Sequence, residues 1–124
     1  MTFKMKALAA AAALAFAGAA QAQISGNVVK IGVLNDQSGL YADLGGPGSV
    51  TAAKMAVEDF TAKDKSLKIE VIFADHQNKP DVATQIANKW IDAEGVDVIV
   101  DVPNSGVALA VNEVVRTKGK VFIN

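Results

Sequence analysis

The sequence of 124 residues contains no cysteine and only one histidine. Without cysteine the chain forms no disulfide, offers no thiol nucleophile and builds no cysteine-based zinc site. The single histidine, His76, does not supply the clustered ligands of a transition-metal site, and a catalytic triad would have to be built around it alone. These absences disfavour hydrolases and metalloenzymes. We therefore expect a protein that is not an enzyme and uses no metal or cofactor.

An excess of positive charge is also missing. The chain has 12 Lys and Arg residues against 13 Asp and Glu residues, which gives a formal net charge of −1. The basic residues form no cluster that could neutralise a row of phosphates. The sequence therefore argues against nucleic acid as a partner.

The first 22 residues contain the three parts of a secretory signal peptide. Lys4 and Lys6 precede an apolar run over residues 7–20, which closes on the small-x-small triplet Ala20-Gln21-Ala22. The run is shorter than the roughly 20 residues that span a bilayer, and this favours cleavage over membrane anchoring. No cysteine follows the triplet to carry a lipid. We predict that residues 1–22 are removed and that a soluble product works outside the cytoplasm.

From residue 28 onward, short runs rich in Val and Ile alternate with longer segments of helical period. The runs show little polar alternation, as is typical of strands buried on both faces of a parallel sheet. Strands are predicted over residues 28–34, 69–74, 96–100 and 121–123. Successive strand–helix–strand units with right-handed crossovers predict an α/β fold with a doubly wound, Rossmann-like parallel sheet. The mature chain, residues 23–124, is long enough for one small domain.

Local signals mark the three predicted helices. The first covers about residues 47–62, with Pro47 in its first turn. Asn78 is the predicted cap of the second, and Gly95 ends it in the left-handed conformation. The third begins near residue 104 or 105 and ends before Gly119. Each helix carries an apolar stripe. The stripes are Val50, Ala53, Val57 and Phe60; Val82, Ala83, Ile86, Trp90 and Ile91; and Val107, Ala108, Val111, Val114 and Val115.

Ligands of open α/β sheets bind outside the carboxyl ends of the strands. Three predicted loops lie at that edge, over residues 35–46, 75–79 and 101–105. Ser38 with Gly39, and Asn104 with Ser105, each place a hydroxyl and backbone N–H groups there. The second pair opens a helix, whose positive dipole end suits a carboxylate. The alternative is that Asn104 or Ser105 caps its own helix, and both roles can coexist.

Other polar and aromatic residues of this edge allow two interpretations each. Tyr41 can cover an apolar ligand or only the small core of its own loop. His76 can hydrogen-bond within its loop or contact a ligand, and the first is favoured on residue type. Asp36 and Asp101 could hold Mg²⁺ as in a flavodoxin-like phosphoacceptor domain, but we favour solvated or N–H-capping carboxylates.

The glycine-rich segment 45–49 has the appearance of a phosphate-binding loop. It lacks the Lys and Ser/Thr that follow the final glycine of a P-loop, and it lies too far after the first strand for a dinucleotide fingerprint. We interpret it as a tight turn into the helix that starts at Pro47.

Several stretches together resemble the leucine/isoleucine/valine-binding protein family. They are residues 29–34 (VKIGVL), 36–41 (DQSGLY), 45–60, 75–81 (DHQNKPD) and 120–124 (KVFIN). Members are extracytoplasmic solute-binding components of ABC importers, with a type I periplasmic-binding fold whose two Rossmann-like lobes clamp a ligand. The resemblance implies that residues 23–124 form part of the N-terminal lobe and work in the periplasm. It also implies a small-molecule solute and the membrane permease of an ABC transporter as partners.

The same resemblance implies roles for single residues. The first loop, with Ser38, Gly39 and Tyr41, would face the ligand, and Ser105 would hydrogen-bond the ligand's carboxylate or its main-chain-like polar groups. Residues 101–103 (DVP) depart from members that bind α-amino acids, which often have a glycine soon after the third strand. Residues 36–41 and 45–49 are closer to a branch associated with aromatic carboxylates. The expected solute is a branched-chain amino acid or a related small carboxylate, including aromatic acids. A ligand-sensing module of the same fold is the alternative.

Members of that family are much longer, with a second lobe and a hinge. We therefore expect the chain to be a truncated reading frame or a fragment that covers the opening part of the first lobe.

Overall fold

The computed structural model describes residue 24 and residues 26–124, so the predicted leader lies outside the described residues. The predicted order of strands and helices is confirmed, with small changes at the ends. The elements are β1 (Val28–Asn35), α2 (Gly46–Lys63), β2 (Lys68–Asp75), α3 (Pro80–Ala93), β3 (Val98–Val100), α4 (Ser105–Thr117) and β4 (Val121–Ile123). Within the described part of the chain, no helix has both the length and the apolar character needed to cross a membrane.

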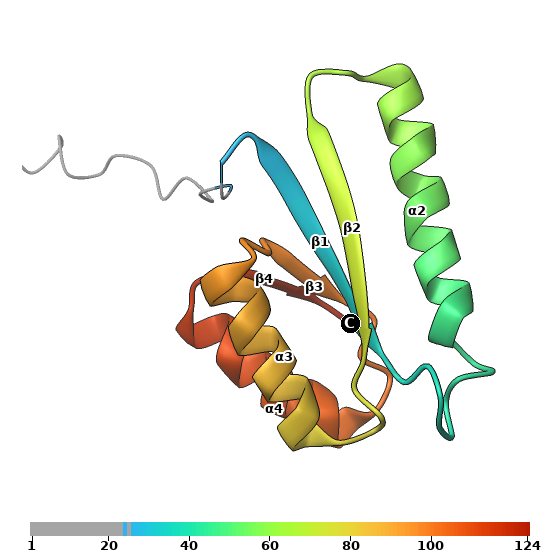
Figure 1. Ribbon diagram of the computed structural model, residues 1–124, viewed down its shortest axis with the longest axis vertical. Helices are drawn as coiled ribbons and strands as arrows, with labels where there is room; N and C mark the ends of the chain where they lie inside the picture. Colours follow the sequence, from blue (N-terminus) through green and yellow to red (C-terminus); the bar gives the residue numbers. More distant parts are fainter. Residues whose placement is uncertain (1–23, 25) are drawn as a thin grey trace, which may run out of the picture.

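The four strands form one parallel sheet in the order β2-β1-β3-β4. Val33 of β1 pairs with Phe73 of β2 on one side and with Val100 of β3 on the other. Helix α2 covers one face of the sheet, whereas α3 and α4 lie together on the other (Figure 1). The prediction of a doubly wound α/β sheet is therefore confirmed.

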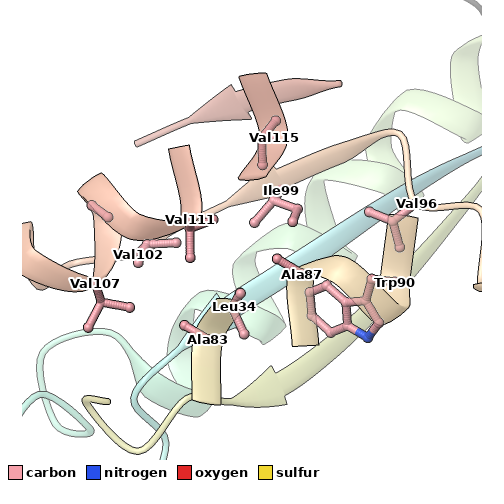
Figure 2. Packing of buried hydrophobic residues seen from close by; sticks show 11 residues of the cluster. Leu34, Ala83, Ala87, Trp90, Val96, Ile99, Val102, Val107, Val111 and Val115 are labelled. Carbon is pink, nitrogen blue, oxygen red and sulfur yellow. The ribbon is translucent and has the colours of Figure 1, made fainter. Parts of the chain in front are cut away.

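The main hydrophobic core lies between the sheet and the pair α3 and α4 (Figure 2). Leu34 of β1 and Ile99 of β3 are fully buried there. Trp90 of α3 is only 5% exposed, as its place on the apolar stripe predicted. Its ring lies so close to β1 that a Cβ on Gly32 would be 2.5 Å from Cζ3 of the ring. The remaining buried members are Ala83, Ala87, Val96, Val102, Val107, Ala108, Val111 and Val115.

The face that carries α2 is less well covered. Val50 is buried, but Phe60 at the other end of the predicted apolar stripe is 41% exposed. Helix α2 makes its main contacts with β2 and β1. On the same face, Val121 and Ile123 of the edge strand β4 are 43% and 60% exposed.

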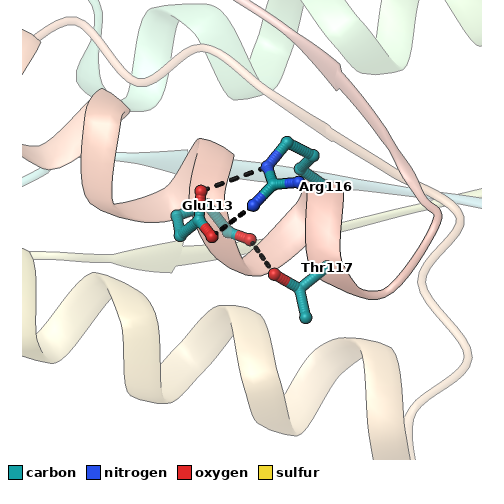
Figure 3. Close-up of polar contacts among 3 residues, drawn as sticks. All are labelled: Glu113, Arg116 and Thr117. Atoms are coloured by element: carbon teal, nitrogen blue, oxygen red, sulfur yellow. Dashed lines mark hydrogen bonds and ion pairs between the residues drawn. The ribbon is translucent and has the colours of Figure 1, made fainter.

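Most of the predicted helix ends are confirmed, and one is wrong. Asn78 does not cap α3. The N-cap is Lys79, and Asn78 lies with Gln77 in a turn where both residues have φ near +55°, because the chain reverses before Pro80. Gly95 has the predicted positive φ of 70°. Helix α4 ends at Thr117. In its last turn the exposed Arg116 donates two hydrogen bonds to the Glu113 carboxylate, and the Thr117 hydroxyl donates to the Glu113 carbonyl (Figure 3).

Strand β3 begins at Val98, two residues later than predicted, and Val96 and Asp97 lie before it. Asp97 is only 7% exposed and joins three segments at the amino edge of the sheet. Its carboxylate accepts from the Lys30 N–H of β1 and lies 2.9 Å from Nζ of Lys120, which precedes β4. Its backbone N–H and carbonyl bond to Lys30 and Val121. This residue therefore aligns β1, β3 and β4 at the end opposite the candidate site.

Candidate functional site at the carboxyl edge of the sheet

Asn35, the last residue of β1, connects three segments at the carboxyl edge. Its side chain is fully buried. The amide Nδ2 donates to the Gly46 carbonyl at 2.9 Å and to Oδ2 of Asp101 at 2.8 Å. Asp101 follows β3 and has a φ of +59°, an uncommon conformation for a residue with a side chain. The end of β1, the start of α2 and the loop after β3 are therefore held together.

Asp36 shapes the loop that contains three of the predicted ligand residues. Its fully buried carboxylate accepts from the backbone N–H groups of Gly39 at 2.9 Å and Tyr41 at 3.0 Å. A Cβ on residue 39 would lie 2.7 Å from Oδ2 of Asp36, so only glycine fits there. Of the two interpretations of Asp36, N–H capping is confirmed. The Gly39 and Tyr41 N–H groups are used within the loop.

Asp75, the last residue of β2, joins the first and second loops. Its Oδ1 accepts from the N–H groups of Gln37 at 3.1 Å and Gln77 at 2.7 Å, and its Oδ2 accepts from the Ser38 hydroxyl at 2.6 Å. Burial raises the pKa of Asp75, but the hydrogen bonds from Ser38, Gln37 and Gln77 and the nearby His76 outweigh burial and hold the pKa below its ordinary value. The group is therefore an anion at neutral pH.

His76 is fully buried beneath these loops. Its Nδ1 accepts from the Asn78 N–H at 2.9 Å, so the predicted hydrogen bond within its own loop is confirmed. Burial lowers the pKa of His76, against the opposing effect of Asp36, Asp75 and Asp101, so the ring is neutral near pH 7. Because Nδ1 is an acceptor, the proton of the neutral ring is on Nε2.

The N-terminus of α4 carries the other two predicted residues. Asn104 is the N-cap, and its side chain accepts from the Val107 N–H at 3.1 Å, so the capping interpretation is confirmed for Asn104. Ser105, the first residue of the helix, is exposed, and its hydroxyl makes no hydrogen bond with any described residue. The N–H groups of Ser105 and Gly106 are the first of the helix and have no intrahelical partner.

The predicted residues thus form two groups. Ser38, Gly39 and Tyr41 lie in the loop after β1, and Asn104 and Ser105 lie at the start of α4, after β3. Because β1 and β3 are neighbours in the sheet, both groups belong to the same edge. No hydrogen bond joins them directly among the described residues. Within that part of the chain there is also no group of three or more metal-binding side chains.

Sequence reasoning did not single out Asn35 or Asp75, which organise the loops. Both are polar residues that directly follow the apolar run of a strand, which was the only signal available. Apart from Gln77, which lies two residues after Asp75, the hydrogen-bond partners of Asn35 and Asp75 given above lie 11 to 66 residues away along the chain.

Comparison with known proteins identifies the family. Residues 28–124 match the periplasmic binding protein family. The chain therefore belongs to this family, and its fold is part of the type I periplasmic-binding fold. A search among curated protein sequences finds no match.

Solved structures of similar proteins extend well beyond this chain. A periplasmic binding protein from Burkholderia mallei is 49% identical with a TM-score of 0.74, and the match covers 79% of this chain and 26% of that one. A branched chain amino acid ABC transporter periplasmic ligand-binding protein from Burkholderia xenovorans is 48% identical, with a TM-score of 0.71 and coverages of 76% and 25%. An ABC transporter solute binding protein from R. palustris, solved in complex with benzoate, is 30% identical, with a TM-score of 0.66 and coverages of 77% and 26%. The chain spans about a quarter of the length of these relatives.

Proposed function

We propose that the chain is part of the N-terminal lobe of the solute-binding component of an ABC importer, with a small carboxylate as solute. The observation that carries the proposal is the N-terminus of α4. Asn104 caps the helix, which leaves the Ser105 hydroxyl and the N–H groups of Ser105 and Gly106 without partners in the described chain. Helix N-termini attract anions through their dipole and free N–H groups.

The relatives support the chemistry of this site. One is described as a branched chain amino acid ligand-binding protein and another holds benzoate, and both of these ligand types carry a carboxylate. The proposed site consists of Ser105 and Asn104 at α4 together with Ser38, Gly39 and Tyr41 of the first loop. Tyr41 would cover the apolar part of the solute.

The proposed partners and location follow from the family. The solute would be clamped between this lobe and a second one, and the closed form would dock on a membrane permease. Residues 1–22 would direct export to the periplasm and be removed. Of the two alternatives that the sequence left open, transport is favoured over sensing because relatives at 48% and 30% identity are described as ABC transporter proteins.

A chimera tests the proposal. The mature chain replaces the corresponding quarter of the Burkholderia mallei protein, and calorimetry measures binding of amino acids and aromatic acids. Ser105→Ala should weaken binding of the preferred acid by about 1.5 to 3 kcal/mol, since it removes a charge-assisted hydrogen bond. Stability should change little, because Asn104 and not Ser105 caps the helix.

Ser66→Ala is the matched control. Ser66 is an exposed serine before β2, at the opposite edge of the sheet, and its loss should leave affinity unchanged. Equal affinities of Ser105→Ala and the unsubstituted chimera would remove Ser105 from the site.

A further inference from the structure

The hydroxyl groups of Ser38 and Ser105 differ in what they can offer a solute. The Ser38 hydroxyl donates its only proton to Oδ2 of Asp75 at 2.6 Å. An ionised carboxylate accepts hydrogen bonds and cannot donate them, so the direction of this bond is fixed. Ser38 therefore presents only lone pairs to a solute, whereas the Ser105 hydroxyl, which has no partner among the described residues, can donate.

We infer that Asp75 is a positioning residue that makes Ser38 a hydrogen-bond acceptor, and that the solute carries a donor group, an ammonium or hydroxyl, besides its carboxylate. This inference rests on the proposed function and specifies the solute class within it. The carboxylate would lie at the start of α4 and the donor group at the first loop. A plain carboxylate would leave the Ser38 acceptor without a partner.

The charges around the first loop agree with this assignment. Asp75 and Asp36 both bond directly to the segment 37–41, and Asp101 bonds to Asn35 beneath it. Lys79, a basic residue of the second loop, donates to the Gln77 side chain. The first loop therefore favours a positive or donating group, and the start of α4 favours a negative one.

The substitution Asp75→Asn reverses the bond to Ser38 with little other change. The two backbone N–H groups, from Gln37 and Gln77, both bond to Oδ1, which an asparagine retains. Only Oδ2 faces Ser38, and there the new NH₂ group donates to the hydroxyl oxygen. The Ser38 hydroxyl proton then no longer bonds to residue 75, so the hydroxyl can donate a hydrogen bond to the solute.

The test uses the full mature chain within the chimera described above and two pairs of probes. The pairs are L-leucine with 4-methylpentanoate and 4-hydroxybenzoate with benzoate, whose members differ only in the donor group. The unsubstituted protein should prefer the donor-bearing member of the pair it binds. Asp75→Asn and Ser38→Ala should each reduce that preference. The reduction should be roughly fivefold for the hydroxyl-bearing pair, which corresponds to one neutral hydrogen bond, and larger for the leucine pair, whose donor is charged. In the double variant the two effects should not add, because both act on one hydroxyl.

Asp81→Asn is the control for the loss of a negative charge, since Asp81 is exposed in the first turn of α3. It should leave the preference unchanged. If Asp75→Asn weakens both members of a pair equally, Asp75 is merely structural and the inference is overturned, while the proposed function stands. If the unsubstituted chimera binds none of these acids, the proposed function fails and the inference fails with it.

Discussion

Gly32 is the position where the backbone of β1 meets the indole of Trp90. A Cβ there would lie 2.5 Å from the ring, and the ring is held by the core around it. We expect Gly32→Ala to lower the free energy of unfolding by about 1 to 3 kcal/mol, the usual cost of overpacking a core. Urea denaturation measures this loss.

Gly48 supplies the control for that substitution. It lies in the first turn of α2, and a Cβ there would meet no atom within 4 Å. Gly48→Ala should leave stability unchanged or raise it slightly, because alanine favours the helix. Equal effects of the two substitutions would contradict the close approach of Gly32 to Trp90.

His76, the one histidine of the sequence, makes stability depend on pH near neutrality. Burial lowers its pKa in the folded state, so between that pKa and the ordinary value near 6.5 the unfolded chain binds more protons. Stability should therefore fall as pH decreases from 7.5 to 5.5. Asp36, Asp75 and Asp101 reduce the effect because they favour the charged ring.

The variant His76→Asn separates this titration from the structural role of the ring. An asparagine side chain can still accept from the N–H two residues on, as His76 does with Asn78, but it does not titrate. Denaturation midpoints of the variant should be nearly equal at pH 7.5 and 5.5. An identical pH slope in both proteins would show that another group is responsible.

At the scale of the elements, Asp97 is the contact that aligns β1, β3 and β4. Its buried carboxylate pairs with Lys120 and accepts from the Lys30 N–H. Substitution of Asp97 by alanine removes both interactions from a buried position. We expect Asp97→Ala to cost about 2 to 4 kcal/mol in thermal or urea unfolding. Glu113→Ala removes an exposed pair on α4 and should change little. Similar losses for both would contradict this role of Asp97.

The sequence predicted the elements well where short-range signals control them. Gly95 ends α3 through its own backbone conformation, and Asn104 begins α4 through its own side chain. The Val/Ile-rich runs form the predicted strands. The cap of α3 was wrong because Asn78 is needed in the turn before Pro80. How much of the α2 stripe is buried could not be predicted, since burial depends on which segments cover that face of the sheet.

In the candidate site, too, short-range sequence signals predicted some features, and contacts between distant residues determine the others. The place of Asn104 and Ser105 at the start of α4 could be predicted because a helix N-terminus can be located from sequence. The direction of the Ser38 hydroxyl could not be predicted, because it depends on Asp75, which lies 37 residues away along the chain. The register of β1 and β2 brings the two residues together.

At the scale of the whole molecule, the uncovered part of the sheet should control the behaviour of this chain in isolation. Val121 and Ile123 are exposed on β4, which among the described strands pairs with β3 alone. Such an edge is available for pairing with other chains. We expect residues 23–124 alone to self-associate in size-exclusion chromatography, and the double variant Val121→Lys, Ile123→Lys to associate less. A monodisperse unsubstituted chain would contradict this expectation.

The central claim is that a small carboxylate binds at the carboxyl edge, between the start of α4 and the first loop. The most direct measurement is a titration of residues 23–124 carrying Val121→Lys and Ile123→Lys, the double variant that should associate less. The protein is isotope-labelled, carboxylate probes are added, and NMR records the shifts of the backbone amide signals. We predict shifts at Ser105, Gly106 and residues 38–41, with an affinity weaker than about a millimolar, or about −4 kcal/mol, because one lobe encloses the solute from one side only. Shifts confined to the amino edge around Lys120, or micromolar affinity of the single lobe, would contradict the account.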